Sequence, residues 1–220
     1  MTNSFLRETF RIIRLFSGLF AYSFGIVLTL RANVGYAPWE VFQKGLTLHL
    51  GLTMGQAHIL VAVILVLIVV FMKENVGFGT ICNMIFIGVF MDIILSWNRI
   101  PLMYAFFPGA AMMIGGLFVL GIASVLYIGA GYGAGPRDSL MVVLTKRTGK
   151  PVGLCRGYIE GTVLAVGWLL GGYAGIGTVI SALGIGVAIQ IVFSILRFDV
   201  KKIHQESFYE TYLRFRNMLK

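Results

Sequence analysis

The sequence predicts an all-α polytopic membrane protein that consists of two homologous repeats. Of its 220 residues, 58% are hydrophobic and only 12% are charged, whereas soluble domains are about 45–50% apolar and about 25% charged. Several apolar stretches are long enough to cross a hydrocarbon core of about 30 Å. A shift of 98 residues, the separation of Pro38 and Pro136, aligns many glycine and proline positions of the two halves. Matched glycine and proline residues indicate matched backbone geometry, and hence duplication.

Each repeat is expected to contain three transmembrane helices and one short helix. The spans are predicted at residues 15–30, 56–72, 78–97, 107–128, 152–170 and 177–196. The chain divides into a basic cytoplasmic flank, a first repeat, a second repeat and an amphipathic basic tail, at residues 1–14, 15–100, 101–197 and 198–220. No small-residue cleavage site follows the first span, which favours an uncleaved helix over a signal peptide.

A polar break followed by a short helix interrupts the apolar pattern once in each repeat. In the first repeat the break is Arg31–Ala37, and Pro38 suits the first position of a helix because its missing N–H costs nothing there. The helix continues for about 13 residues up to Gly51, or about 20 Å at 1.5 Å per residue. This half-helix is too short to cross a core of roughly 30 Å. The second half-helix is predicted at residues 136–147.

The orientation of the repeats depends on these half-helices. If each is re-entrant and returns to the side from which it starts, the repeats have inverted topology; if each crosses, the repeats are parallel with four crossing helices each. The distribution of Lys and Arg does not decide between the two arrangements, although both place both termini in the cytoplasm. The shortness and polarity of the half-helices favour inversion, which is common in secondary transporters.

Polar groups at membrane depth are the candidates for binding, because they are costly there and usually face a cavity or one another. An acidic residue, Glu40 or Asp138, stands two places after the proline of each half-helix. Each carboxylate could hold a proton or a cation, or could simply complement the dipole of its own helix N-terminus. The predicted substrate- or ion-binding residues are Asn33, Tyr36, Trp39, Glu40, Tyr132, Arg137 and Asp138.

Three further ionisable residues are predicted to pair helices or to act as a gate. Arg156 and Glu160 are four residues apart and can pair on one face of a helix, either as a static lock or as part of a gate. Asp92 lies inside the third span, where it needs a partner or water. His58 is expected to be a packed histidine rather than a proton relay.

The sequence gives no support for a metal site, a cofactor, an enzyme or nucleic-acid binding. Cys82 and Cys155 do not correspond between the halves, and three scattered histidines form no HExxH motif or ligand set. The formal net charge is +9, but the basic residues lie beside hydrophobic spans, where they act as topology signals and contact lipid headgroups. The expected partners are therefore the lipid bilayer and a small solute.

Small residues recur at helical spacing on the last two spans. Gly157 and Gly161 lie on the fifth span, and Gly177, Ser181, Ala182 and Gly186 lie on the sixth. Such stripes permit close helix contact. We expect that contact within the chain, with a homodimer seam as the alternative.

The C-terminal tail alternates aromatic and basic residues. Apolar side chains follow helical spacing at Phe208, Tyr212, Phe215 and Leu219, against Lys and Arg. The pattern predicts an amphipathic helix on the inner leaflet, or alternatively a helix that binds a partner.

A set of paired motifs recurs in the two halves. In each, a glycine-containing break leads to proline and then to Trp-Glu or Arg-Asp, and a later Gly-x-Gly-Thr opens a span. These motifs are Gly35–Glu40, Gly51–Gly55 and Gly77–Thr80 in the first half, and Gly135–Asp138, Thr148–Gly153 and Gly175–Thr178 in the second. The pattern resembles the bacterial YczE and YitT family of small multi-pass membrane proteins over nearly the whole chain except its tails. The resemblance implies a protein of the bacterial cytoplasmic membrane in a family suspected of transport, with some members linked to secondary metabolite production, and supplies no substrate or catalytic residue.

Two function classes follow from these features. The first is a secondary transporter of a small solute held between the two half-helices, with proton coupling through the carboxylates as one option. The second is a membrane regulator or assembly partner that does not transport and acts through its cytoplasmic tail. The charge of the solute stays open, because helix N-termini favour an anion whereas Glu40 and Asp138 favour a cation or proton.

Overall fold

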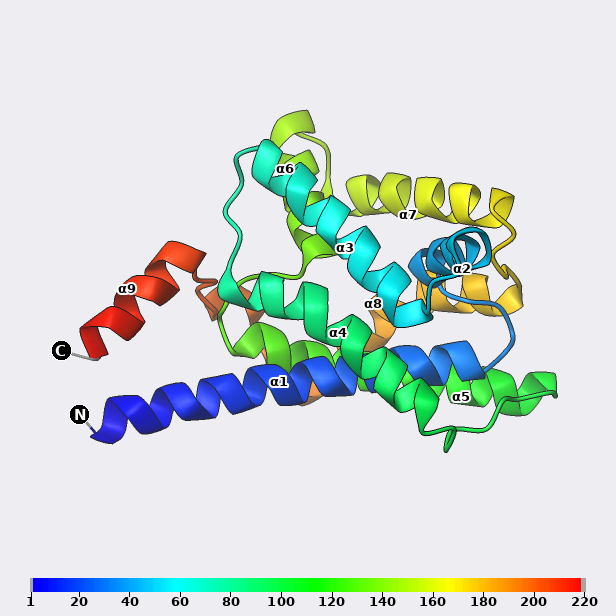
Figure 1. The fold of residues 1–220 in the computed structure, drawn as a ribbon, viewed down its shortest axis with the longest axis horizontal. Helices are drawn as coiled ribbons and strands as arrows, with labels where there is room; N and C mark the ends of the chain where they lie inside the picture. The colour runs from blue at the N-terminus through cyan, green and yellow to red at the C-terminus, as the bar shows by residue number, and fades with distance from the viewer. Residues whose placement is uncertain (1, 219–220) are drawn as a thin grey trace.

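A computed structural model describes residues 2–218, and within them the secondary structure is entirely helical, as predicted (Figure 1). The helices are α1 (Thr2–Arg31), α2 (Pro38–Leu50), α3 (Met54–Phe71), α4 (Phe78–Ser96), α5 (Phe106–Gly129), α6 (Pro136–Thr148), α7 (Val152–Leu169), α8 (Ile176–Ile195) and α9 (Phe208–Met218), with a 3₁₀ turn η1 (Val200–Lys202) before the last. Helices α2 and α6 begin at Pro38 and Pro136 and have 13 residues each. Leu219, which the tail pattern included, lies outside the described residues.

Five helices of the described chain are long and apolar enough to cross a membrane: Leu6–Arg31 of α1, together with α3, α4, α5 and α8. The protein is therefore a polytopic membrane protein. The fifth predicted span, residues 152–170, corresponds to α7, which has 18 residues, as α3 does. Helix α7 is not among the five, because Arg156 and Glu160 interrupt its apolar surface.

Both described termini lie at one end of the molecule, which we call the terminal end (Figure 1). There Arg11 of α1 pairs with Glu206 of the tail at 2.9 Å, and the Phe208 N–H donates to the Val76 carbonyl, in the α3–α4 loop, at 3.0 Å. At the opposite end, the Met103 N–H donates to the Arg31 carbonyl at 2.9 Å. Helices α1, α4 and α7 therefore run away from the terminal end, and α3, α5 and α8 run back toward it.

Helices α2 and α6 do not run from end to end. The first turn of each lies in the middle of the molecule, where Glu40 of α2 meets Arg137 of α6. Helix α2 ends at the opposite end, beside the start of α3, whereas α6 ends at the terminal end, where Lys146 pairs with Glu74 at 2.5 Å.

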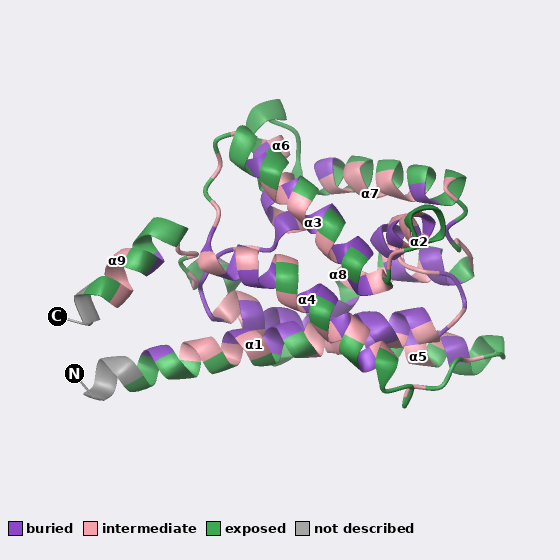
Figure 2. Ribbon diagram, in the orientation of Figure 1, coloured by how far each residue is buried: buried purple, intermediate pink, exposed green. Residues whose placement is uncertain are grey.

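The core lies where α1 packs against α5, with α4 and α8 alongside (Figure 2). Leu19 and Val27 of α1 are fully buried there. Glycine lets the two backbones approach, since a Cβ on Gly18 would lie 2.6 Å from the Tyr127 nitrogen. By contrast, α7 buries only Cys155 and Gly167 among its described residues.

The two polar breaks have matching backbone conformations. Gly35 and Gly133 have φ angles of 115° and 114°, a region that side chains rarely allow. The breaks also exchange hydrogen bonds between the halves. The Gly79 N–H, at the start of α4, donates to the Tyr132 carbonyl at 2.7 Å, and the Gly177 N–H, at the start of α8, donates to the Val34 carbonyl at 2.7 Å. Each break thus holds the first turn of a long helix of the other half.

The tail folds back onto the terminal end. Phe215 packs against the core, whereas Phe208 and Tyr212 are exposed. The Ser207 N–H donates to the Glu210 carboxylate at 2.6 Å and lowers the pKa of that carboxyl. Helix α9 therefore buries only part of its apolar face in this conformation.

The small residues of α7 do not pack as expected. A Cβ on Gly157 or on Gly161 would meet no heavy atom of the described chain within 4 Å, so the prediction of intramolecular packing is wrong for these two positions. On α8 the expectation holds for Gly177, whose Cβ would lie 2.6 Å from a methyl group of Val34, but it is wrong for Gly186, whose Cβ would meet no heavy atom of the described chain within 4 Å.

Candidate functional site

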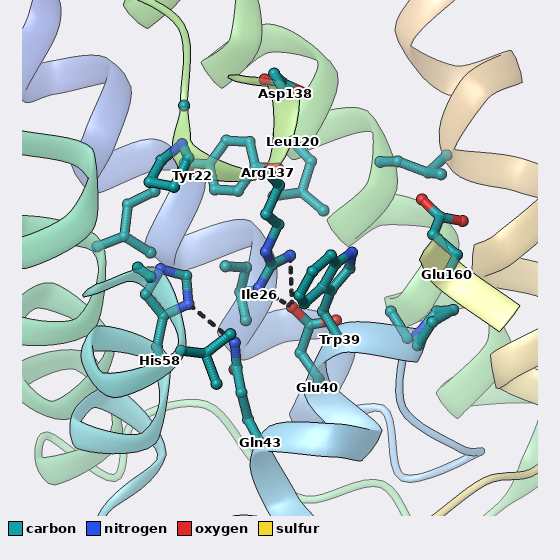
Figure 3. A pocket seen from close by; sticks show the side chains of 18 of the residues that line it. Tyr22, Ile26, Trp39, Glu40, Gln43, His58, Leu120, Arg137, Asp138 and Glu160 are labelled. Carbon is teal, nitrogen blue, oxygen red and sulfur yellow. Dashed lines mark hydrogen bonds and ion pairs between the residues drawn. The ribbon is translucent and has the colours of Figure 1, made fainter. Parts of the chain in front are cut away.

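A cavity of about 120 Å³ lies in the middle of the molecule and is lined by side chains from all of the helices α1 to α8 (Figure 3). The first turns of α2 and α6 form two facing walls of the cavity. Both helices begin at prolines that line it, Pro38 and Pro136. Five charged side chains line it: Glu40, Arg137, Asp138, Arg156 and Glu160. All five were predicted from the sequence to be functional.

The first turns of α2 and α6 are joined by an ion pair. Glu40 Oε1 lies 3.4 Å from both Nη1 and Nη2 of Arg137, and Glu40 is only 4% exposed. The Arg137 guanidinium also lies over the Trp39 ring, 4.8 Å from its centroid. Since losing one partner of a buried pair leaves an uncompensated charge, this contact strongly couples the two breaks.

Asp138 occupies the place in α6 that Glu40 occupies in α2, but its partner is different. Its carboxylate accepts a hydrogen bond from the Tyr127 hydroxyl at 2.9 Å. Among the described residues, no guanidinium or ammonium group forms an ion pair with it. The equivalent carboxylates of the two halves are thus in different electrostatic surroundings.

Helix α7 contributes an ion pair of its own. Arg156 Nε lies 2.8 Å from Glu160 Oε1, one helical turn away, as their spacing predicts. Both residues line the cavity, beside Ser181 and Ala182 of α8. The pair therefore borders the space between α7 and α8.

Gln43 and His58 are among the buried polar residues of the cavity that were not assigned to the site from the sequence. Gln43 Nε2 and His58 Nδ1 lie 3.3 Å apart, linking α2 to α3. Gln43 lies three residues after Glu40 and so shares its helix face, a signal that could have identified it. His58 is packed, as expected, but it also faces the cavity.

Two predicted residues, Asn33 and Tyr36, lie in the first break and are not among those lining the cavity. The Asn33 amide donates to the Met103 carbonyl at 2.9 Å. The Tyr36 ring packs edge-on against Tyr173, with centroids 5.5 Å apart. Both residues hold together the loops of the opposite end.

Tyr132, also predicted as a binding residue, lies in a separate ionic cluster at the terminal end. Its side chain is fully buried, and its hydroxyl donates to Glu8 at 2.9 Å. The guanidinium groups of Arg11 and Arg214 lie 4.5 and 5.3 Å from its ring centroid. The cluster joins the second break to the N-terminal segment and the tail.

Asp92 pairs helices away from the cavity. Its carboxylate accepts from the Gly55 N–H at 2.9 Å and from the Thr53 hydroxyl at 2.5 Å. These groups start α3, so Asp92 fastens α4 to the first turn of α3.

The chemistry of the cavity is that of binding and charge pairing. No group of three or more His, Cys, Asp or Glu side chains in the described chain could hold a metal ion. The cavity presents two ion pairs, a carboxylate that is hydrogen-bonded but not ion-paired, and aromatic rings, which suit a charged or hydrogen-bonding small molecule.

Comparison with known proteins relates the chain to membrane proteins of unknown function. A family described as being of unknown function, DUF6198, matches residues 9–194. The uncharacterized membrane protein YczE of Bacillus subtilis (strain 168) is 35% identical over 178 residues, covering 80% of this chain and 81% of that protein. An uncharacterized protein of Haemophilus influenzae is 32% identical over 181 residues, covering 81% and 82%. The resemblance to YczE-like proteins is thereby confirmed. No solved structure matches the chain significantly.

Proposed function

The chain belongs to the family of unknown function DUF6198, and we propose that it is a secondary transporter of a small solute that binds in the cavity between α2 and α6. The observation that carries the proposal is the ion pair between Glu40 and Arg137, which brings the first turns of two short helices together at a central cavity. Transporters commonly bind substrate at the midplane, between discontinuous helices of two repeats. A static membrane anchor has no need of five charged side chains around a buried space.

The proposal includes two repeats of inverted topology. It is supported by the closely similar φ angles at Gly35 and Gly133, by the reciprocal hydrogen bonds between the halves, and by the opposite directions of α1 and α5. In a bilayer the terminal end would face the cytoplasm, with both termini, and α2 and α6 would enter from opposite sides. The protein would lie in the cytoplasmic membrane of a bacterium.

The test is access to the cavity from both sides of the membrane. Ala182 lines the cavity on α8, and the Ala182→Cys variant would be made in a background lacking Cys82 and Cys155. Intact cells and inverted vesicles would be treated with a membrane-impermeant maleimide. A transporter that alternates between two states is expected to label from both sides.

Marker variants fix the sidedness of that experiment. Asn75→Cys is expected to label only from the inside, and Asn98→Cys and Tyr173→Cys only from the outside. Asn75 labelled from outside with Asn98 labelled from inside would instead mean that the short helices cross and that the repeats are parallel. Labelling of Ala182→Cys from one side only would contradict transport through the cavity.

A second candidate function is that of a membrane regulator acting through α9. It is favoured by the exposed aromatic residues Phe208, Tyr209 and Tyr212, which are 52%, 68% and 55% exposed. The double variant Tyr209→Ser/Tyr212→Ser removes aromatic surface without touching the ionic cluster at Tyr132. A regulator would lose its cellular effect in this variant, whereas a transporter would keep its two-sided access.

A further inference from the structure

We propose that the solute is an organic cation with an apolar substituent, whose charged group lies in the cavity near Asp138 and whose substituent lies in an adjoining apolar groove. The biological role of this ligand rests on the proposed transport function. Its binding does not, and can be measured on the purified protein without transport.

The charge balance of the cavity favours a cation. Three carboxylates and two guanidiniums line it, which leaves one negative charge. Arg137 is paired with Glu40, and Arg156 is paired with Glu160. The remaining carboxylate, Asp138, accepts a hydrogen bond from the Tyr127 hydroxyl and forms no ion pair in the part of the chain that the structure describes, and Arg156 acts on it only at longer range. An anionic ligand would have to compete for a guanidinium that is already paired, whereas a cation would complete the balance.

Aromatic rings around the same space also suit a cation. Tyr22, Trp39 and Tyr127 all line the cavity. The rings of Tyr22 and Tyr127 meet edge-on, with centroids 5.8 Å apart. The faces of such rings attract ammonium groups, and this attraction grows when water is excluded.

The apolar substituent has a defined place. A groove of about 400 Å³ lies between α2, α3, α6 and α7 and is lined by apolar residues such as Phe42, Leu140 and Val163. Trp39 lines both the groove and the cavity, as do Val61, Leu65 and Ile159. The two spaces therefore share a wall, and the proposed ligand would occupy both.

The groove also reaches the outer surface of a membrane helix. Ile64 of α3 lines it and is 48% exposed. A ligand dissolved in the bilayer could therefore enter sideways, with its apolar part leading. A bilayer acyl chain is the rival occupant of the groove, and the binding experiment must separate the two.

The experiment uses Trp39 as a fluorescent reporter in purified protein. The exposed Trp97 and Trp168 are replaced by phenylalanine, which leaves Trp39 as the only one of three tryptophans. The probes are n-alkylamines from butylamine to octylamine, which are protonated at pH 7, with hexanol and hexanoate as neutral and anionic controls. We expect saturable binding of hexylamine, at least about tenfold tighter than either control. Affinity should rise by up to about fourfold for each methylene group that is buried.

Matched variants test the two parts of the ligand separately. Asp138→Asn is expected to weaken hexylamine binding by about tenfold or more while leaving hexanol unchanged. Thr162→Phe fills the groove and should flatten the dependence of affinity on chain length. Val166→Phe is the control, because Val166 lies one turn further along α7, is exposed, and is not among the groove residues.

The outcomes are distinct for the ligand and for transport. Equal affinities for hexylamine, hexanol and hexanoate would overturn the proposal that the ligand is a cation. A chain-length dependence unaffected by Thr162→Phe would mean that the groove holds lipid only. Either result leaves two-sided labelling of the cavity intact. Conversely, selective amine binding together with one-sided labelling would uphold the ligand class and reject transport.

Discussion

Helices α3 and α4 pack closely along each other, whereas α7 and α8, which hold the same places in the second half of the chain, barely touch over their described residues. The glycines that allow the first contact are present in the second pair too. A Cβ on Gly88 of α4 would lie 2.5 Å from the Gly55 carbonyl oxygen of α3. The equivalent positions, Gly153 and Gly186, would meet no heavy atom of the described chain within 4 Å.

Hydrogen bonds from the start of α3 to Asp92 of α4 explain part of this difference. Asp92 of α4 binds the Thr53 hydroxyl and the Gly55 N–H at the start of α3. A shift of 98 residues puts Pro151 in place of Thr53 and Gln190 in place of Asp92. The second half therefore has small residues that permit contact but lacks the carboxylate and hydroxyl that would hold it.

The separation of α7 from α8 matters because both helices border the cavity. Arg156 and Glu160 face it from α7, and Ser181 faces it from α8. Two helix pairs whose positions differ by 98 residues thus show a closed and an open arrangement in one molecule. Small residues permit either arrangement, and the polar contacts of Asp92 contribute to the closed one.

The largest expected effect comes from filling the closed contact. Gly88→Leu should lower the free energy of unfolding by about 3 kcal/mol, because the new side chain would overlap the α3 backbone. Gly186→Leu should cost nothing measurable, since its site is open. Denaturation of both purified variants in the same detergent tests the contrast, and equal losses would mean that the second pair is also closed in solution.

Removal of the Asp92 hydrogen bonds should lower the free energy of unfolding by a smaller amount. Asp92→Leu leaves the Gly55 N–H without its partner and is expected to cost about 2 kcal/mol. Gln190→Leu, at the exposed equivalent site, should stay within about 0.5 kcal/mol of the natural protein. The same denaturation measurement serves for both, and a loss in Gln190→Leu as large as in Asp92→Leu would refute the asymmetry.

The smallest effect on stability is expected for a double cysteine variant, Gly153→Cys/Gly186→Cys. If α7 closes on α8 during transport, a short bismaleimide should link the two cysteines in membranes, as mass spectrometry of the digested protein would reveal. Leu169→Cys/Gly186→Cys is the control, because Leu169 lies at the other end of α7. The absence of any link in the first variant would show that the open arrangement is permanent.

Features that depend on a few neighbouring residues could be predicted from the sequence. The starts of α2 and α6 at Pro38 and Pro136, their ends before Gly51 and Gly149, and the Arg156–Glu160 pair all follow from local rules. Proline and glycine restrict the backbone directly, so no knowledge of the tertiary structure was needed.

Features that depend on contacts between distant segments could not be predicted. Tyr132 has the polarity of a binding residue, but its partners Glu8 and Arg214 lie 124 and 82 residues away, in the N-terminal helix and the tail. The separation of α7 from α8 could not be predicted either, because Gly153 and Gly186 have the same spacing in the sequence as Gly55 and Gly88, which are closely packed. Which carboxylate is paired, Glu40 or Asp138, likewise depends on where Arg137 points in three dimensions.

The hydrogen bonds between each break and the start of a long helix in the other half bear on the order in which the chain folds during synthesis. The Gly79 N–H at the start of α4 finds its acceptor, the Tyr132 carbonyl, only in a segment synthesised more than 50 residues later. Until that segment is made, the Gly79 N–H lacks this acceptor, and an unpaired backbone donor is costly wherever water is excluded. The first half is therefore an incomplete folding unit during translation, and its maturation waits for the ribosome to deliver the second.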